Sequence, residues 1–209
     1  MKIEKLNKDN IKEFIRDMKI EEANDLEHNI NKSELYGIKK DDNFCLGFDS
    51  LTNIDTIAIL HYSPKMSTEL FYECIDFLER ILVVENHLII EVSNEKYIKL
   101  LDEKYKCKEM NVVLELSKNG EQHSIENINT KEKFVDIEMN SIKYNYSKGN
   151  IYCNFIKQNI FDEKLILDLH NYFTELNIDY ITYCIDEENY EYLKTLNYKC
   201  LKKSYVIKN

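Results

Sequence analysis

One eleven-residue pattern occurs twice in this chain, and it restricts the fold more than any other feature. The first copy, YIKLLDEKYKC, covers 97–107, and the second copy, YEYLKTLNYKC, covers 190–200. Five of the eleven aligned positions are identical without a gap, namely Tyr, Leu, Tyr, Lys and Cys. If one structural unit has been used twice, the segments around each copy should repeat the same elements in the same order.

Hydrophobic periodicity predicts the same order of elements around both copies: three β-rich runs, a helix, a buried strand, a second helix and a last strand. In the first copy these elements are expected at 34–62, 67–86, 87–92, 94–105 and 109–116. In the second copy they are expected at 134–158, 162–176, 180–185, 189–197 and 202–208. We therefore predict a duplication. A nearly complete unit at 1–117 begins with an extra strand and helix, a polar linker covers 118–132, and a truncated unit covers 133–209.

Two of the predicted helices of the first unit show a clear apolar face, as does the helix at 162–176 of the second. The extra helix, within 7–30, has four apolar residues at helical spacing: Ile11, Phe14, Ile15 and Met18. The helix at 67–86 can be capped by Ser67 or Thr68. Its apolar face is expected to contain Leu70, Cys74, Phe77, Leu78 and Ile81.

Composition and charge limit the classes of partner. The chain has 209 residues, of which 44% are hydrophobic, which is typical of a globular protein. Its formal net charge is -10, so a phosphate backbone would be repelled and nucleic acid is not expected as a partner. No apolar run approaches the roughly 20 residues of a membrane span, and the N-terminus lacks the apolar stretch of a signal peptide. We predict a cytoplasmic protein that does not enter a membrane.

The cysteines and histidines predict no metal site. None of the six cysteines forms a C-x-x-C pair, and most lie in apolar runs such as NFCLGF and IYCNFI. Such cysteines are expected to be buried, reduced thiols that pack as small hydrophobic side chains. The five histidines are scattered without ligand spacing.

The expected order of elements resembles that of the GNAT superfamily of acyl-CoA-dependent N-acetyltransferases. Two local details sharpen the resemblance. Pro64, the chain's only proline, follows the third strand in LHYSP, where the family often has V-x-P. The family's last helix ends in L-x-K-L-G-F, with a left-handed glycine; here LKTLNYKC places Asn197 at that position, and Asn tolerates this conformation well. The resemblance implies an α/β (α+β) fold with mixed sheets and flanking helices, built as one nearly complete unit plus a truncated half-unit.

The resemblance also implies acetyl-CoA as the cofactor. The main chain of the strand at 56–62 would hold the pantetheine arm, and the loop at 63–68 with the following helix N-terminus would hold the pyrophosphate. The residues assigned to the cofactor are Ile59, Leu60, Tyr62, Lys65, Ser67 and Thr68. This chain departs from the family in one respect: the Q/R-x-x-G-x-G/A loop is missing, because the corresponding segments SPKMSTELF and KQNIFDEKL contain no glycine. The first copy is favoured, because Asp162 and Glu163 in the second would oppose a phosphate.

Three residues are candidates for catalysis, each with an alternative structural role. Glu91 is a carboxylate in the otherwise apolar run HLIIEV and could act as the base for an amine, or could simply face outward at the strand's end. Tyr97 lies near, but not in register with, the tyrosine that the family uses as a general acid, and a helix tyrosine is more often a packing residue. His61 ends the strand that would border the acyl site, where a histidine usually has a local partner.

Two functions of different class remain open from the sequence. The first is transfer of an acetyl group from acetyl-CoA to a primary amine of a small molecule or peptide. The second is a non-catalytic GNAT-fold protein, a binding or regulatory module that has lost the coenzyme A loop. A half-unit without its first strand and helix is also expected to expose an apolar sheet face or edge. That surface would dock on the other copy or form a homodimer through the C-terminal half-unit.

Overall fold

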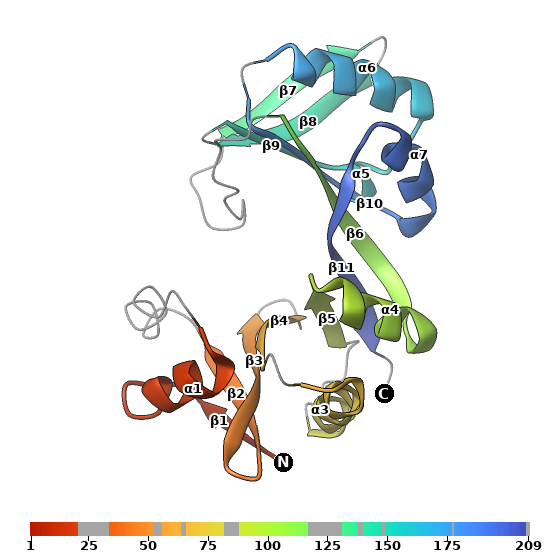
Figure 1. Cartoon of the computed structure of the whole chain (residues 1–209). Helices are drawn as coiled ribbons and strands as arrows, with labels where there is room; N and C mark the ends of the chain where they lie inside the picture. The colour runs from red at the N-terminus through yellow and green to blue at the C-terminus, as the bar shows by residue number, and fades with distance from the viewer. Residues whose placement is uncertain are drawn as a thin grey trace. The chain divides into compact units, whose positions relative to one another are not determined.

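The computed structural model describes residues 1–20, 34–51, 56–63, 66–81, 88–116, 131–137, 140–147, 149–176 and 178–207. Their strands form a mixed sheet with the order β1-β2-β3-β4-β5-β11-β6-β10-β9-β8-β7, flanked by helices (Figure 1). This confirms the predicted α/β class. By its contacts the chain divides into two compact units: unit 1 is Met1–Cys107 with Ser204–Asn209, and unit 2 is Lys108–Lys203.

Unit 1 begins with a strand, a helix and an antiparallel meander, as expected. Its elements are β1 (Lys2–Lys5), α1 (Ile11–Met18), β2 (Leu35–Lys40), β3 (Asn43–Leu51), β4 (Thr56–Tyr62), α3 (Thr68–Ile81), β5 (Leu88–Val92) and α4 (Glu95–Lys104). Strands β1 to β4 pair antiparallel in sequence order, and β4 pairs parallel with β5. The parallel step needs a crossover connection, and α3 supplies it.

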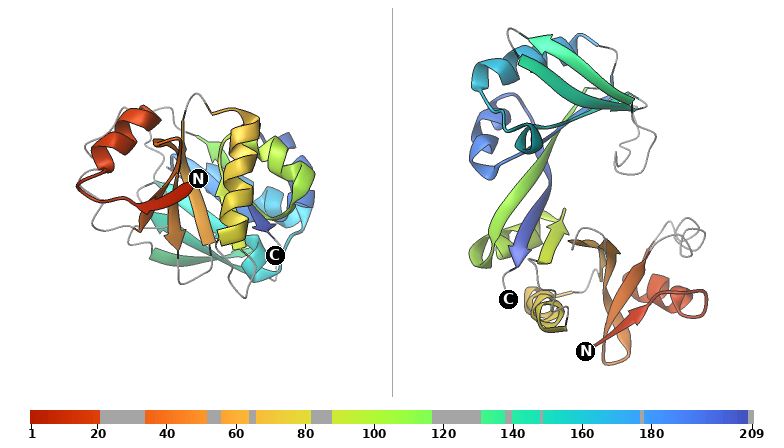
Figure 2. Two further views of the ribbon diagram at one scale, coloured as in Figure 1. Left: turned by 90° about the horizontal axis from the view of Figure 1, so that it is seen from below. Right: turned by 180° about the vertical axis from the view of Figure 1, so that it is seen from behind.

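Helices cover both faces of the unit 1 sheet, because neighbouring residues of a strand point to opposite sides. The Phe44 ring lies 5.3 Å from the ring of Phe14 in α1, whereas the sulfur of the next residue, Cys45, contacts Cys74 in α3. Helices α1 and α3 therefore lie on opposite faces, which both views of Figure 2 also show. Helix α4 shares the α3 face, where the Tyr72 hydroxyl donates to the Leu100 carbonyl.

Unit 2 repeats this pairing with its own meander. Its elements are β6 (Lys106–Glu115), β7 (Lys131–Ile137), β8 (Asn140–Ser147), β9 (Asn150–Asn154), α5 (Phe155–Gln158), α6 (Glu163–Thr174), β10 (Tyr180–Ile185), a 3-10 turn η2 (Glu187–Asn189), α7 (Tyr190–Thr195) and β11 (Lys199–Ile207). Strands β7, β8 and β9 are antiparallel, and β9 pairs parallel with β10. Helix α6 covers β7 and β8 (Figure 1). The duplication stays a prediction, to which the structure adds that the pairing pattern recurs.

The compact units do not follow the predicted boundaries at 117 and 133, because two strands run from one unit into the other. Strand β6 begins at Lys106 after α4 of unit 1 and continues in unit 2, where it pairs antiparallel with β10. Strand β11 begins in unit 2, and from Ser204 onward it belongs to unit 1. Most of the predicted linker, residues 118–130, lies outside the described residues.

The second face of the unit 2 sheet carries polar side chains among apolar ones such as Val113 and Tyr152. This face lies opposite the side that α6 and α7 cover. It carries Asn111, Thr182, Asn145 and Asn150, since the register places Asn111 beside Cys184 and Thr182 beside Tyr152. Asn111, Thr182 and Asn150 are buried. Docking of this half on the other copy or on a second chain stays a prediction.

Candidate functional site

Strands β4 and β5 of unit 1 separate halfway along their length. Their parallel pairing covers Thr56, Ile57 and Ala58 of β4, opposite Ile89, Ile90 and Glu91, and does not continue into Ile59 and Val92. On its other side β4 contains a β-bulge: Gly47 pairs with His61 and Phe48 with Ile59, so Leu60 is an extra residue. The described part of β4 beyond Ala58 therefore presents main-chain groups that β5 does not use.

This opening is where the sequence assigned three of the cofactor residues. Ile59 is buried, Leu60 is half exposed, and Tyr62 is partly buried. The unit 2 counterpart has no such opening in its described residues, because β9 pairs with β10 from Asn150 through Asn154. Within the described residues, the strands therefore separate in unit 1 but not at the corresponding place in unit 2.

A row of side chains crosses β3, β4 and β5 at the point where the strands separate. The register places Asp49 beside Ala58, and Ala58 beside Glu91. With neighbouring strands about 4.8 Å apart, the main chains of Asp49 and Glu91 are about 10 Å apart, with only a methyl group between them. Burial raises the pKa of the Asp49 carboxyl, and the nearby Glu34 adds to this. Glu91 Oε1 accepts a hydrogen bond from Ser204 Oγ at 3.3 Å. We call Asp49, Ala58 and Glu91 together the carboxylate row.

The sequence pointed to Glu91 but missed Asp49. An aspartate at the end of NFCLGFDS looks like the start of a turn, and only the register of β3 against β4 places it opposite Glu91. The signal was an acidic residue at a strand position, which is uncommon. No periodicity could have supplied its partner.

His61 lies on the same sheet face as the carboxylate row, in β4 directly after the bulge at Leu60. Its ring contacts Phe14 edge-on at a centroid distance of 6.0 Å, so the imidazole faces α1. Burial lowers the pKa of His61, which keeps the imidazole neutral near pH 7. A neutral imidazole could accept a proton, and its contacts are equally those of a packing residue.

Tyr97 lies on the opposite face, between aromatic rings. It is 3% exposed, its ring stacks on Phe71 at 4.1 Å, and Tyr62 meets it edge-on at 5.0 Å. Its hydroxyl donates to the Met66 carbonyl over a long 3.4 Å. Burial raises the pKa of Tyr97, with contributions from Tyr62 and Cys74. The phenol therefore stays protonated, as a general acid must, but in this conformation it is packed in the core.

The N-terminus of α3 is the expected anion site. Ser67 Oγ accepts a hydrogen bond from the Leu70 amide, which confirms Ser67 as the cap. Glu69 lowers the suitability of this end for a phosphate. Its carboxylate accepts hydrogen bonds from its own amide first, then from Ser67 and Thr68, and these hold the pKa of Glu69 below its ordinary value. The groups expected to bind pyrophosphate thus already bind a carboxylate. Lys65 lies outside the described residues.

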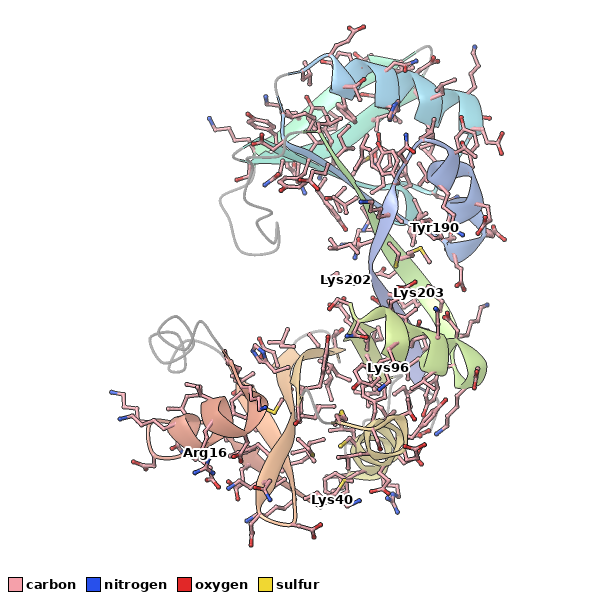
Figure 3. The ribbon with its side chains drawn as sticks, in the orientation of Figure 1. Arg16, Lys40, Lys96, Tyr190, Lys202 and Lys203 are labelled. Carbon is pink, nitrogen blue, oxygen red and sulfur yellow. The ribbon has the colours of Figure 1, made fainter. Side chains whose placement is uncertain are left out.

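A pocket of about 460 Å³ opens beside this helix end. Its walls come from the β2–β3 hairpin, from Ser63 and Met66, and from the first two turns of α3. Lys40 is the last residue of β2 (Figure 3), and its ammonium pairs with the Glu73 carboxylate of α3. With Asp41, Glu69 and Glu73 in its wall, the pocket carries more negative than positive charge.

The described ranges contain no group of three or more His, Cys, Asp or Glu side chains placed to hold a metal ion. Among the described helices, none is both long and apolar enough to span a bilayer.

No protein-family model matches this sequence, and no curated protein matches it. Several solved structures match along nearly the whole chain. A candidate acetyltransferase from Thermoplasma acidophilum matches with a TM-score of 0.47 and 12% identity, over 99% of this chain and 98% of its own. A GCN5-related N-acetyltransferase from Sphaerobacter thermophilus matches with a TM-score of 0.45 and 7% identity, over 98% and 93%. Another from Kribbella flavida matches with a TM-score of 0.40 and 7% identity, over 98% and 71%. The second and third carry the name of the family that the sequence resembles. All three TM-scores lie below 0.5, so only the residues of this chain bear on its function.

Proposed function

We propose that this protein is a GNAT-type acyltransferase that moves an acetyl group from acetyl-CoA to a primary amine, with its site in unit 1. The observation that carries the proposal is the carboxylate row at the opening between β4 and β5. An amine reaches such a site as an ammonium ion, and two carboxylates attract it and then take up its proton. The alanine between them leaves room for the substrate.

The main chain of β4 fits the pantetheine arm of coenzyme A. An arm of this kind carries amides, and the stretch Ile59–Tyr62 offers amides and carbonyls that β5 leaves unused. The helix end fits the pyrophosphate less well, because Glu69 occupies it. When bound, acetyl-CoA would supply the activated acetyl group. The residues of this chain would orient it, with Ile59, Leu60 and Tyr62 along the arm and Ser67 and Thr68 at the phosphate end.

The proton transfers can be assigned to the two faces of the sheet. On the α1 face, Asp49 is the preferred base because its raised pKa brings it closer to neutrality, and Glu91 holds the ammonium group. His61 is the alternative base on that face. On the α4 face, the Tyr97 hydroxyl is the group that could protonate the leaving sulfur. This role requires the phenol to leave its contact with Met66.

A second candidate function has its own support. The Glu69 carboxylate at the helix end and the stacked rings of Phe71, Tyr97 and Tyr62 occupy positions that a cofactor needs. A GNAT-fold binding protein without catalysis would be built in this way. The two functions differ in whether acetyl-CoA binds at all.

Isothermal titration with acetyl-CoA and with free coenzyme A separates them. The transferase proposal expects micromolar binding, and Glu69→Gln should tighten it about fivefold, since one nearby like charge is removed in water. Glu103→Gln, an exposed change on α4, is the matched control and should leave binding unchanged. The absence of heat and of thermal stabilisation at millimolar cofactor, for the wild-type protein and Glu69→Gln alike, would exclude the transferase.

If acetyl-CoA binds, the carboxylate row is tested with a panel of small primary amines and lysine peptides. Asp49→Asn should lower the rate of acetyl transfer by about a hundredfold or more, the usual contribution of a general base. Cofactor affinity should stay the same. A rate unchanged in both Asp49→Asn and Glu91→Gln would remove the row from the mechanism.

A further inference from the structure

Two thiols meet in the core of unit 1 beneath the pocket. Cys45 in β3 and Cys74 in α3 have their sulfur atoms 3.7 Å apart and are 5% and 0% exposed. They come from segments 29 residues apart in the chain. The sequence predicted buried, reduced thiols, and burial is confirmed for both. Their contact was not predicted.

Cys45 lies at a β-bulge. Ile38 pairs with Leu46 and Lys39 with Phe44, so Cys45 is an extra residue in β3. Its side chain points to the face opposite that of Phe44, where its sulfur contacts Cys74 of α3.

The hydrogen bonds make the two thiols unequal. The Cys45 thiol donates to the Ile38 carbonyl at 3.2 Å, so in the contact between the sulfurs Cys74 is the donor. A donor that points at Cys45 lowers the pKa of Cys45, and the charge of Lys40 acts in the same direction, whereas burial and the bond to the Ile38 carbonyl favour the protonated thiol. The same bond, together with burial, raises the pKa of Cys74. Of the two thiols, Cys45 is therefore the one that ionises more readily.

Cys45 also has a route to solvent. It lines the pocket beside α3 together with Ser63, Met66 and Lys40. A pocket of about 460 Å³ admits small molecules such as hydroperoxides. Cys74 does not line it, so an oxidant meets Cys45 first.

We propose that Cys45 and Cys74 form a reversible intramolecular disulfide when the protein meets a hydroperoxide. The Cys45 thiolate attacks the peroxide oxygen, the O–O bond breaks, and a sulfenic acid and one water or alcohol are formed. The Cys74 sulfur then attacks Cys45 Sγ. Its proton leaves with the sulfenic hydroxyl as water, and the S–S bond closes. Two thiols are oxidised and one peroxide is reduced, and a dithiol reductant reverses the change.

Disulfide formation would link α3 covalently to β3, close to the loop that precedes α3. The sulfurs must approach from 3.7 Å to the roughly 2.05 Å of a disulfide bond, a movement of about 1.6 Å. The Cys45 carbonyl accepts the Ser63 amide at 3.0 Å, and Ser67 caps the same helix that carries Cys74. A shift between β3 and α3 therefore changes the loop before α3. That this alters acetyl-CoA binding rests on the proposed function, whereas the disulfide does not.

The test uses the full chain, reduced and then freed of reductant. It is treated with hydrogen peroxide, quenched in acid, alkylated in denaturant and analysed as intact mass and as peptides. We expect a product lighter by two hydrogen atoms that keeps four alkylated cysteines and yields a peptide joining Cys45 to Cys74. In Cys74→Ala, a sulfenic acid at Cys45 should be trapped by dimedone. Cys153→Ser, which removes a buried thiol of unit 2, should behave as the wild-type chain.

The wild-type peptide map alone decides the matter, even if a variant fails to fold. Oxidation of Cys107 and Cys200, which are more exposed, shows that enough peroxide has been added. If Cys45 and Cys74 are still fully alkylated at that point, the proposal is overturned. A disulfide from Cys45 to any other cysteine would overturn it too. Titration of acetyl-CoA into both redox states keeps the two proposals separate. If no cofactor binds in either state, the proposed function fails, and the mass result still judges the disulfide.

Discussion

The removal of one hydroxyl group tests whether the last strand of the chain holds unit 1 together. Tyr205 in β11 is fully buried, and its hydroxyl lies 2.9 Å from Asp102 Oδ1 and 3.1 Å from the Ile98 carbonyl, both in α4. The single proton of the hydroxyl donates to these two acceptors. Tyr205→Phe keeps the ring and removes only this link between the strand and the helix.

The expected cost follows from the acceptors. A hydrogen bond to a charged group contributes about 1.5–3 kcal/mol, and the solvent exposure of Asp102 favours the lower end, about 1.5–2 kcal/mol. For a chain of 209 residues this corresponds to a fall in Tm of about 3–8 °C. Urea and thermal unfolding followed by circular dichroism measure the change. Amide hydrogen exchange should speed up in α4.

The matched control is Tyr192→Phe in unit 2. The Tyr192 hydroxyl donates to one uncharged carbonyl, that of Glu163, at 2.9 Å and near solvent. Its loss should cost about 0.5 kcal/mol, at the low end for a neutral bond. If both variants unfold within about 1 °C of the wild-type protein, or if exchange in α4 is unchanged in Tyr205→Phe, the link to the last strand does not stabilise unit 1.

Three further predictions follow from single positions. Gly37→Ala would place a Cβ 2.4 Å from a Phe44 ring carbon, so denaturant unfolding should show a loss of about 1–3 kcal/mol. Burial lowers the pKa of His61 in the folded protein, so as pH falls below about 6.5 the unfolded chain binds a proton before the folded protein does. The free energy of unfolding should therefore decrease as pH is lowered through this range, and it should decrease less steeply in His61→Gln. The pKa of His170 is also lowered by burial and contributes in the same direction. In a transferase assay, Tyr97→Phe should lower kcat about a hundredfold without changing the amine KM if the phenol is an acid, whereas an unchanged kcat identifies it as a packing residue.

The sequence predicted most of the individual elements, because their signals are local. The extra helix buries Ile11, Phe14 and Met18, as its periodicity indicated. Asn197 has the left-handed φ of 65° that was expected at the end of its helix. The strand at 180–185 was predicted with its observed bounds, since a continuous apolar run surrounded by polar residues leaves little choice.

Other features depend on tertiary contacts and could not be read from the chain. The buried face of α3 contains Phe71, Cys74, Ile75 and Leu78, and Ile81 is 51% exposed, so the predicted face was rotated by part of a turn. Several apolar stripes fit this helix, and packing against β3 and α4 selects one of them. Pairing between strands is equally invisible: Asp49 and Glu91 lie in one row, on either side of Ala58, only because of a strand register that no local pattern specifies.

The course of β11 explains why the C-terminal half matters for a site that it does not contain. Unit 2 pairs β9 with β10 along all the described residues of β9, so it offers no opening of its own. Its last strand nevertheless continues into unit 1, where Ser204 donates to the Glu91 carboxylate and Tyr205 fastens α4. Glu91 is thus held by a residue 113 positions away in the chain. A segment limited to 1–117 would lack both contacts. If the proposed site is correct, the C-terminal half is required without carrying a catalytic residue, because it supplies the strand whose Ser204 bonds Glu91.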